Sequence, residues 1–338
     1  MKLIKTTEAV GHVLCHDLTQ IIPNEYKGAR FRKGHIVTEE DIPVLLSMGK
    51  ENLYVWEKDE RMLHENDAAE ILCKICKGEN ISRSQVREGK IELYADIDGL
   101  FSIEKEKLFT INSIDELMIA TRKSDTLVHK GDKLAGTRVI PLIIQKEKLA
   151  AAERIAGEEP ILCVLPFTLK KAAIVTTGSE VFRGRIEDKF TPVLIEKLKT
   201  YGIEVVSHRT TDDNIEHIRE AIEQSRKDVD IVLCTGGMSV DPDDNTPGAI
   251  KETGADIVTY GAPVLPGAMF LLGYYDDGTP VLGLPGCVMY AKATIFDLVM
   301  PRIAAGVRLS KRDFVAYGEG GLCLGCESCR YPDCGFGK

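Results

Sequence analysis

The sequence predicts an α/β protein whose second half is a three-layer domain on a parallel, mixed-edge sheet, preceded by a smaller β-rich or α+β N-terminal region. From about Lys170 onward, short apolar runs alternate with amphipathic stretches, as strands and helices do in succession. Three of the turns after these runs are rich in glycine or proline, where ligands bind open parallel sheets. Between Lys90 and about Ile144, glycine-punctuated alternating segments indicate a β-rich module.

The strands of the second half are predicted from apolar runs that are too short for helices. They cover 172–177, 203–208, 231–235, 257–260 and 281–284. Helices are predicted near 190–200, 214–226, 246–253 and 288–303, where apolar residues recur with helical spacing. Because helices separate the successive strands, we expect a parallel sheet that is covered on both faces.

The chain is long enough for two or three domains, because a single hydrophobic core stops growing at about 250–300 residues. Near the N-terminus, Thr38 is placed to cap a helix that ends before Gly49, and a strand is expected over 52–56. The run 68–75 also has helical spacing. We therefore expect an α+β segment (1–57), a helical insertion (58–90), a β-rich module (91–167), the α/β domain (168–308) and a cysteine-rich tail (309–338).

The composition excludes some classes of function. Lys and Arg number 43 against 52 Asp and Glu, a net charge of −9 without any basic block, so we expect no nucleic-acid binding. The sequence contains no run of about 18 apolar residues, and its start lacks the apolar core of a signal peptide. We therefore expect a cytoplasmic protein without membrane attachment.

Two of the three turns are short. The turn after 172–177 reads Thr177-Gly178-Ser179-Glu180, where glycine lets the backbone turn sharply and Glu180 could reach a cation or a ligand hydroxyl. The turn after 281–284 contains Pro285-Gly286, which exposes amides for a ligand but is equally a plain chain reversal. The coincidence of such turns at strand ends is what indicates a site.

The turn after 231–235 carries the most chemistry. It reads Thr235-Gly236-Gly237-Met238-Ser239 and is followed by Asp241, Asp243 and Asp244 before a helix start at Thr246-Pro247. Successive glycines let amide groups approach an anion, and the helix start adds its positive dipole end. Carboxylates beside a phosphate favour Mg²⁺. The alternative is a solvated turn with a helix cap at Asp244 or Asn245.

Four segments together resemble a known family. They are TTGSEV (176–181), TGGMSVDPDDNTP (235–247), LPGAMF (265–270) and GLPGCVMYAKATIFDLVMPRI (283–303). In order and spacing they are similar to the molybdopterin-binding domain of the molybdopterin molybdenumtransferases, or molybdenum insertases. The resemblance covers about residues 170–308, and a weaker likeness over 31–56 is to the family's segment that leads into this domain.

The resemblance implies a reaction in which adenylylated molybdopterin and molybdate give molybdenum cofactor and AMP with the assistance of Mg²⁺. By position, Glu180 and Asp244 match acidic site residues, and Asp188, which starts another turn, is the third candidate catalytic residue. The resemblance also implies a homodimer. The candidate ligand-binding residues, from the turns and the resemblance together, are Thr177, Gly178, Ser179, Thr235, Gly236, Gly237, Ser239, Asp241, Pro285 and Gly286.

Two segments depart from the family and leave alternatives open. Insertases carry lysines suited to molybdate before the second Pro-Gly, whereas 260–265 contains none, and the usual Leu-Pro-Gly-Asn-Pro reads Leu-Pro-Gly-Cys-Val at 284–288. One alternative is a carrier that holds molybdopterin or finished cofactor and whose tail docks a molybdoenzyme or senses redox state. Another is a domain of this fold that serves a different nucleotide.

The tail holds four closely spaced cysteines, Cys323, Cys326, Cys329 and Cys334, in the pattern C-x2-C-x2-C-x4-C. Thiolates at this spacing can wrap a small ion or cluster. The pattern approaches a bacterial ferredoxin run, but its last gap is longer and Gly335 stands where proline is usual. An iron–sulfur cluster, Zn²⁺ and a reduced tail without metal all stay open.

The six other cysteines are expected to be small buried side chains. They are Cys15, Cys73, Cys76, Cys163, Cys234 and Cys287. A redox pair is conceivable at Cys73 and Cys76, but no glycine or proline shapes a thioredoxin-like turn there, so two core thiols are the preferred interpretation.

Overall fold

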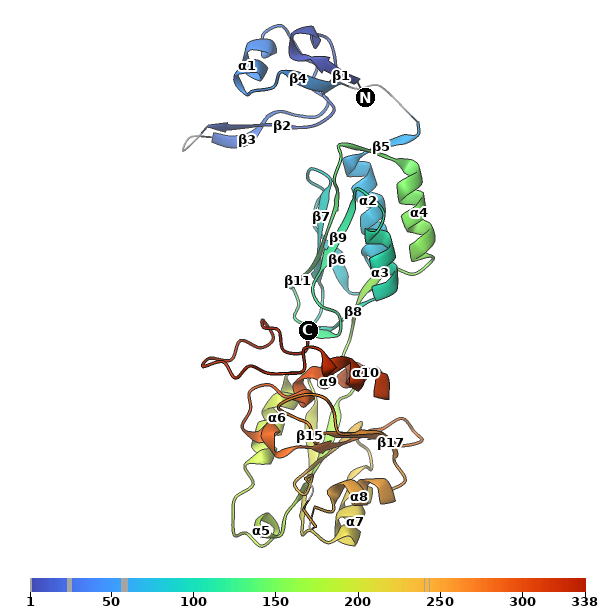
Figure 1. Cartoon of the computed structure of the whole chain (residues 1–338), viewed down its shortest axis with the longest axis vertical. Helices are drawn as coiled ribbons and strands as arrows, with labels where there is room; N and C mark the ends of the chain where they lie inside the picture. Colours follow the sequence, from blue (N-terminus) through green and yellow to red (C-terminus); the bar gives the residue numbers. More distant parts are fainter. Residues whose placement is uncertain (1, 23–25, 56–59, 240, 243) are drawn as a thin grey trace. The chain divides into compact units, whose positions relative to one another are not determined.

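The structure is a computed structural model that describes residues 2–22, 26–55, 60–239, 241–242 and 244–338 (Figure 1). The chain forms two compact units. The first comprises Met1–Asp96, Ile103–Arg122 and Lys130–Cys163, and the second comprises Ile97–Ser102, Lys123–His129 and Val164–Lys338. Within the described ranges, no helix has the length and apolar character needed to cross a membrane.

The second unit is built on a six-stranded sheet. In chain order its strands are β14 (Lys171–Thr177), β15 (Glu204–Thr211), β16 (Ile231–Thr235), β17 (Asp256–Tyr260), β18 (Leu271–Tyr274) and β19 (Pro280–Leu284). They lie side by side in the order β15-β14-β16-β19-β18-β17. The first four are parallel, whereas β18 is antiparallel to both of its neighbours. The prediction of a parallel sheet with a mixed edge is confirmed.

Helices cover both faces of this sheet. Successive residues of a strand point to opposite sides, and those of the central strands are apolar on both sides, so each face needs a covering layer. Ile174 and Leu233 belong to a hydrophobic cluster that includes α6 (Phe190–Lys199) and α9 (Ile295–Ala304). Their neighbours Val175 and Val232 belong to a second cluster with α7 (Ile215–Ser225) and α8 (Thr246–Glu252). All four strand side chains are fully buried, so the three-layer α/β prediction is confirmed.

The last long helix begins later than the sequence pattern predicts. A 3₁₀ turn, η2 (Gly286–Met289), replaces its first residues, and α9 begins at Ile295 rather than near 288. Thr294 sets this start, because its hydroxyl accepts a hydrogen bond from the Phe296 N–H (3.2 Å) while its own N–H donates to Asp297 (2.8 Å). Such a capping box satisfies two backbone donors at a helix start. The unit also contains α5 (Ser179–Phe182), α10 (Lys311–Val315) and η3 (Ala316–Gly318).

The first unit combines several small sheets with four helices. The helices are α1 (Asp41–Ser47), α2 (Glu65–Cys76), α3 (Lys105–Asn112) and α4 (Lys146–Ala156). Around them are η1 (Thr6–Glu8), β1 (Lys2–Lys5), β2 (Leu18–Ile22), β3 (Tyr26–Phe31), β4 (Asn52–Val55), β5 (Met62–His64), β6 (Ile81–Arg83), β7 (Lys90–Ala95), β9 (Leu117–Thr121), β11 (Lys133–Val139) and β12 (Ile143–Gln145). β8 (Gly99–Ile103), β10 (Thr126–Val128) and β13 (Leu162–Leu165) pair in a further sheet whose strands draw on both units.

The elements of the first unit partly match the sequence pattern. α1 and α2 lie where helices are expected, and β4 matches the strand predicted over 52–56, whose last residue, Trp56, lies outside the described residues. The segment expected to be β-rich also contains α3 and α4. The α4 sequence, KEKLAAAERIA, is rich in strong helix formers, so its composition carries a helix signal within that module.

Most cysteines outside the tail are buried. Cys15, Cys73, Cys76 and Cys234 are buried as expected, whereas Cys163 and Cys287 are only half-buried. Burial raises the pKa of the Cys234 thiol to about 12, so this group stays protonated and behaves as a small apolar side chain.

Candidate functional site

The predicted turns converge at one edge of the second unit's sheet. β14, β16 and β19 end side by side, with Thr176 opposite Thr235 and Thr235 opposite Leu284. The carboxyl ends of parallel strands therefore deliver the turns after Thr177, Thr235 and Leu284 to the same edge. We call the loops after β14, β15, β16 and β19 (178–179, 212–213, 236–245 and 285–286) the carboxyl rim.

The first two turns are tied together through Asp213, which follows β15. Its carboxylate accepts a hydrogen bond from the Ser179 N–H (2.8 Å), and its carbonyl accepts one from the Asn245 side chain (2.9 Å). The Gly178 N–H donates to the Thr211 carbonyl at 3.1 Å. Three separate loops thus share one hydrogen-bonded frame.

The two adjacent glycines are held against the first turn at very short range. Gly236 has a φ of +88°, and a Cβ there would lie 2.2 Å from the Thr177 carbonyl oxygen. Gly237 has a φ of +52°, and a Cβ there would lie 2.9 Å from the Thr246 hydroxyl oxygen. That hydroxyl donates to the Gly236 carbonyl (2.9 Å) and also contacts the Thr177 hydroxyl (3.1 Å). Only glycine fits both positions.

The acidic residues lie on the exposed side of this frame. Glu180 and Asp241 are exposed and Asp244 is half-buried, while Asp243 lies outside the described residues. The Asp244 N–H donates to the Asp241 carbonyl at 2.9 Å, which closes a turn. Tyr260, at the end of β17, donates its hydroxyl to the Met238 carbonyl at 3.0 Å. Burial and the nearby Asp244 charge raise the pKa of Tyr260, so the hydroxyl stays a donor.

The remaining predicted rim residues differ in exposure. Ser239 and Gly286 are exposed, whereas Thr177, Thr235 and Pro285 are buried. No side chain or backbone atom lies within 4 Å of where a Cβ on Gly286 would be, so this turn is open to solvent. A ligand at the rim would therefore meet backbone and the Ser239 hydroxyl, with the buried threonines holding the frame behind them.

Asp188 lies just before α6 and is held by its own set of hydrogen bonds. Its carboxylate accepts hydrogen bonds from the Phe190 N–H (2.8 Å), the Thr191 N–H (3.1 Å), the Thr191 hydroxyl (2.6 Å) and the Thr176 hydroxyl (3.1 Å). His208 of β15 lies 3.3 Å from it. These contacts make Asp188 a helix cap and the centre of a buried polar network.

The four tail cysteines line one pocket on the second unit. Cys326 and Cys329 are exposed, and Cys323 and Cys334 are half-buried. Among the described residues, no group of three or more His, Cys, Asp or Glu side chains is already arranged to hold a metal ion.

Comparison with known families identifies the sheet domain. Residues 173–305 match the family described as "Probable molybdopterin binding domain". This segment is a member of that domain family. Residues 3–57 match a second family, described as "Domain of unknown function (DUF8806)".

Individual proteins are similar to the chain over different extents. The chain is 23% identical over 330 aligned residues to the molybdopterin molybdenumtransferase of Staphylococcus epidermidis. This alignment covers 88% of this chain and 71% of that protein. It is 35% identical over 85 residues to a CinA-like protein of Pseudothermotoga lettingae. That match spans 25% of this chain and only 21% of the CinA-like protein.

Solved structures similar to the chain include the molybdopterin biosynthesis moea protein from Pyrococcus horikosii and the tungsten cofactor synthesizing protein MoaB from Pyrococcus furiosus. The first is 16% identical, with a TM-score of 0.35, and the match covers 72% of this chain and 80% of that chain. The second is 21% identical, with a TM-score of 0.34, and the match covers 40% of this chain and 93% of that chain.

Several residues in or beside the carboxyl rim are not among the predicted site residues. Asp213, Asn245 and Thr246 hold the turns together, and Tyr260 holds the glycine loop from β17. Asp213 follows a strand of the sheet, so the rule that found the other turns also points to it. The role of Tyr260 depends on a contact across the sheet that a single sequence does not reveal.

Replacement of Asp188 by alanine is expected to destabilise the molybdopterin-binding-family domain by about 1–2 kcal/mol at pH 7, because α6 loses its cap. Burial alone would raise the pKa of Asp188, but the hydrogen bonds from Thr191, Phe190 and Thr176 outweigh it and hold that pKa below its usual value. A carboxylate with a depressed folded-state pKa contributes stability above its unfolded pKa of about 4, and loses it as pH falls through the folded value. Urea unfolding between pH 7 and pH 3 measures this difference.

The exposed neighbour Glu187 provides the control. Glu187→Ala is expected to change the free energy of unfolding by less than about 0.5 kcal/mol at any of these pH values. A difference between Asp188→Ala and the parent chain that stays constant down to pH 3 would contradict the assigned network.

Proposed function

We propose that the carboxyl rim binds adenylylated molybdopterin and that the protein transfers molybdenum from molybdate to the pterin, releasing AMP. The observation that carries this proposal is the convergence of glycine-containing turns around Gly236 and Gly237, whose backbone conformations only glycine adopts without strain. Membership of residues 173–305 in the molybdopterin-binding domain family supports the pterin as ligand.

The chemistry of the rim fits a phosphorylated ligand with a hard cation. Backbone amides of the half-buried Gly236 and Gly237 and of the exposed Ser239 would contact the pterin phosphate. The carboxylates of Glu180, Asp241 and Asp244 are oxygen donors of the kind that Mg²⁺ prefers, and they are accessible at the surface of the rim. When bound, Mg²⁺ would supply polarisation of the phosphoanhydride.

The chain's own residues hold the reactants in this proposal. The rim amides orient the phosphate, Asp244 and Glu180 fix the cation, and Tyr260 keeps the glycine loop in place through the Met238 carbonyl. Asp188 acts from behind the rim by holding Thr176 of β14. Catalytic roles for Asp244, Glu180 and Asp188 remain part of the proposal.

Replacement of Asp244 by alanine is expected to lower AMP release by about 100-fold, because a ligand of the cation is lost. The assay incubates the full chain with adenylylated molybdopterin, molybdate and Mg²⁺, and AMP is quantified by chromatography. Asp276→Ala is the matched control, since Asp276 is an exposed acid on the turn between β18 and β19 at the opposite edge of the sheet. Equal AMP release by the Asp244 variant and the parent chain would refute the catalytic role.

A second candidate function is that of a carrier that binds molybdopterin or finished cofactor without turnover. The segment 260–265, which contains no lysine, supports it. Leu265 in this segment is engaged by the chain's own tail: its N–H donates to Gly321 (2.8 Å) and its carbonyl accepts from Cys323 (2.8 Å). Tight binding of the pterin in the same assay without AMP release would select the carrier.

Other parts of the proposal concern organisation. We propose the domain limits 1–57, 58–90, 91–167, 168–308 and 309–338, a homodimer, and a cytoplasmic location. Docking of a molybdoenzyme belongs to the carrier alternative. Analytical ultracentrifugation of the full chain tests the homodimer directly.

A further inference from the structure

The cysteine tail is a closed loop rather than a free end. At its start, the Cys323 N–H donates to the Leu265 carbonyl at 2.8 Å. At its far end, the Gly337 N–H donates to the Gly320 carbonyl at 2.9 Å. A Cβ on Gly337 would lie 2.4 Å from the Leu298 side chain, so the returning chain packs tightly on α9. All four cysteines lie between these two closing contacts.

Two aromatic side chains fix the loop to the domain core. Phe336 is only 4% exposed and belongs to the main hydrophobic cluster together with Phe296 of α9. The Tyr331 hydroxyl donates to the Asp297 carbonyl at 3.0 Å, and its ring packs edge-on against Phe336 with centroids 6.2 Å apart. The loop therefore has a defined position on the domain.

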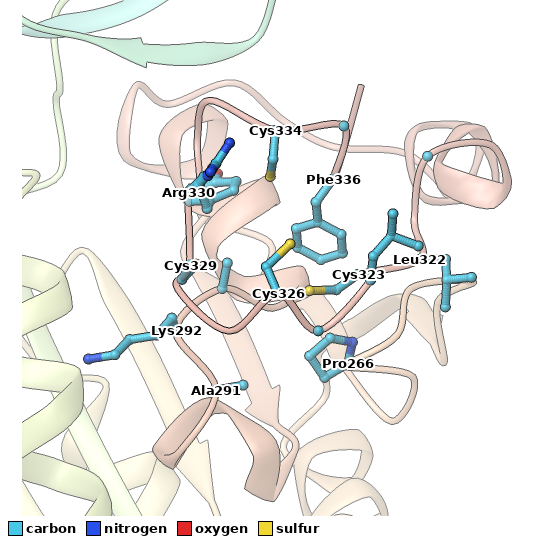
Figure 2. A pocket seen from close by; sticks show the side chains of 16 residues that line it. Pro266, Ala291, Lys292, Leu322, Cys323, Cys326, Cys329, Arg330, Cys334 and Phe336 are labelled. Carbon is cyan, nitrogen blue, oxygen red and sulfur yellow. The ribbon is translucent and has the colours of Figure 1, made fainter.

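The four cysteines are among the residues that line one pocket of about 460 Å³. Figure 2 shows Cys323 and Cys326 approaching the ring of Phe336, with Cys334 pointing inward from the other side of the loop. Apolar side chains such as Leu322 and Pro266 form much of the remaining wall. Cys326 and Cys329 are exposed and lie on the part of the loop between its anchored ends.

We propose that Cys323, Cys326, Cys329 and Cys334 bind an iron–sulfur cluster of the four-iron type in this pocket. In bacterial ferredoxins a C-x2-C-x2-C run supplies three thiolates to one four-iron cluster. Here Cys334 lines the same pocket as the three cysteines of the run and would be the fourth ligand. A single Zn²⁺ draws its four sulfurs to about 2.3 Å from the metal and leaves no space between them. The pocket that these cysteines help to line, about 460 Å³ in volume, has room for a cluster of several atoms.

The surroundings of the pocket suit an anionic tetrathiolate cluster. Each thiol loses its proton to solvent when its iron–sulfur bond forms, so the assembled site carries negative charge. Arg330 lines the same pocket and would offset part of that charge. The apolar wall would limit solvent access, which is one of the protein's means of setting a cluster's potential.

The proposed cluster site does not share residues with the carboxyl rim. Pro266 belongs to the connection that begins where β17 ends, and Ala291 to Ala293 belong to the connection after η2, a few residues beyond Gly286. β17 runs parallel to β19 because both are antiparallel to β18, so these connections start at the same sheet edge as the rim. The proposal stands whether the rim is catalytic or only binding.

Anaerobic reconstitution of the full chain with ferric iron, sulfide and a thiol reductant, which reduces part of the iron, tests this proposal. The expected product holds about four iron and about four sulfide per chain and shows a broad absorbance near 400 nm that dithionite bleaches. Cys326→Ser is expected to hold less than one iron per chain without loss of folding, because Cys326 is exposed. Far-ultraviolet circular dichroism and thermal unfolding of this variant check that the fold is retained.

Cys163→Ser is the matched control, since Cys163 lies on β13 outside the tail and outside the rim. It is expected to retain the full iron and sulfide content. A parallel titration with Zn²⁺ alone distinguishes the other metal. Tight binding of one Zn²⁺ without retention of iron and sulfide would overturn the proposal, as would a parent chain that retains neither metal, or equal iron content in Cys326→Ser.

Discussion

Replacement of Gly236 by alanine is expected to destabilise the molybdopterin-binding-family domain by about 2–5 kcal/mol, the sum of backbone strain and overpacking. The residue has a φ of +88°, which costs a side-chain-bearing residue about 1–2 kcal/mol. The added methyl group would also lie 2.2 Å from the Thr177 carbonyl oxygen and 2.7 Å from the Thr177 hydroxyl oxygen. Overpacking of this kind costs about 1–3 kcal/mol, because the backbone must move. Urea unfolding monitored by circular dichroism measures the change.

Substitution of Gly278 is the control that separates backbone strain from steric overlap. It has a similar φ of +86°, but nothing lies within 4 Å of where its Cβ would be. Gly278→Ala is therefore expected to cost only the backbone strain of about 1–2 kcal/mol. Binding of adenylylated molybdopterin, measured by calorimetry, should be lost in the Gly236 variant and kept in the Gly278 variant. Equal stability losses would mean that the contact with Thr177 is not tight.

The fold of the second unit was predictable because its central strands are buried on both faces. A strand such as Ile231–Thr235 is a continuous apolar run, and β14 and β19 show the same pattern. Helices such as α7 carry one apolar stripe, with Ile218 and Ile222 one turn apart and buried. The apolar strand runs and the helical apolar stripes together predict alternating strands and helices, and this alternation predicts the parallel sheet.

β18 was missed because it breaks this alternation. It follows β17 without a helix between them and returns antiparallel. Its sequence, LLGY, is four residues long and fully buried, so no period distinguishes it from a helix fragment. The late start of α9, in contrast to β18, has a signal in the sequence. The capping pair Thr294 and Asp297 marks the start that the structure has.

The candidate site was predictable in its backbone and less so in its side chains. Gly236, Gly237 and Pro285 follow strands directly, so their convergence depends only on strands being parallel neighbours. The link from Tyr260 to Met238 depends on which strands lie on the far side of β19 and on the bulge in β17 between Ile257 and Thr259. Those details are set by packing of the whole sheet, and a single sequence does not carry them.

The contacts of the cysteine tail add information that its sequence pattern does not contain. As a pattern, the four cysteines favour a metal site over a metal-free tail but do not distinguish an iron–sulfur cluster from Zn²⁺. The burial of Phe336 and the pairing of Cys323 with Leu265 give the loop fixed ends on the domain. A loop with fixed ends loses less conformational entropy when it closes on a cluster, which favours binding.

Replacement of Phe336 by alanine is expected to release the tail from the domain. Removal of a buried phenylalanine costs about 3–5 kcal/mol, and Phe336 is 4% exposed within the main hydrophobic cluster. Because the tail can detach while the sheet stays folded, local opening should grow more than global unfolding. The Leu265 N–H is bonded to the Gly321 carbonyl, and the Cys323 N–H to the Leu265 carbonyl. Hydrogen exchange at these two amides should therefore accelerate by about 100-fold or more.

Leu324 provides the control for this change within the same tail. It is 84% exposed, so Leu324→Ala removes an apolar side chain without opening a cavity and should leave exchange at Leu265 nearly unchanged. Similar acceleration in both variants would mean that Phe336 does not anchor the loop, and the pocket would then lack a fixed frame. Faster exchange in Phe336→Ala alone would show that segment 260–265 is ordered by the tail. Leu265 loses both of its hydrogen-bond partners when the tail detaches.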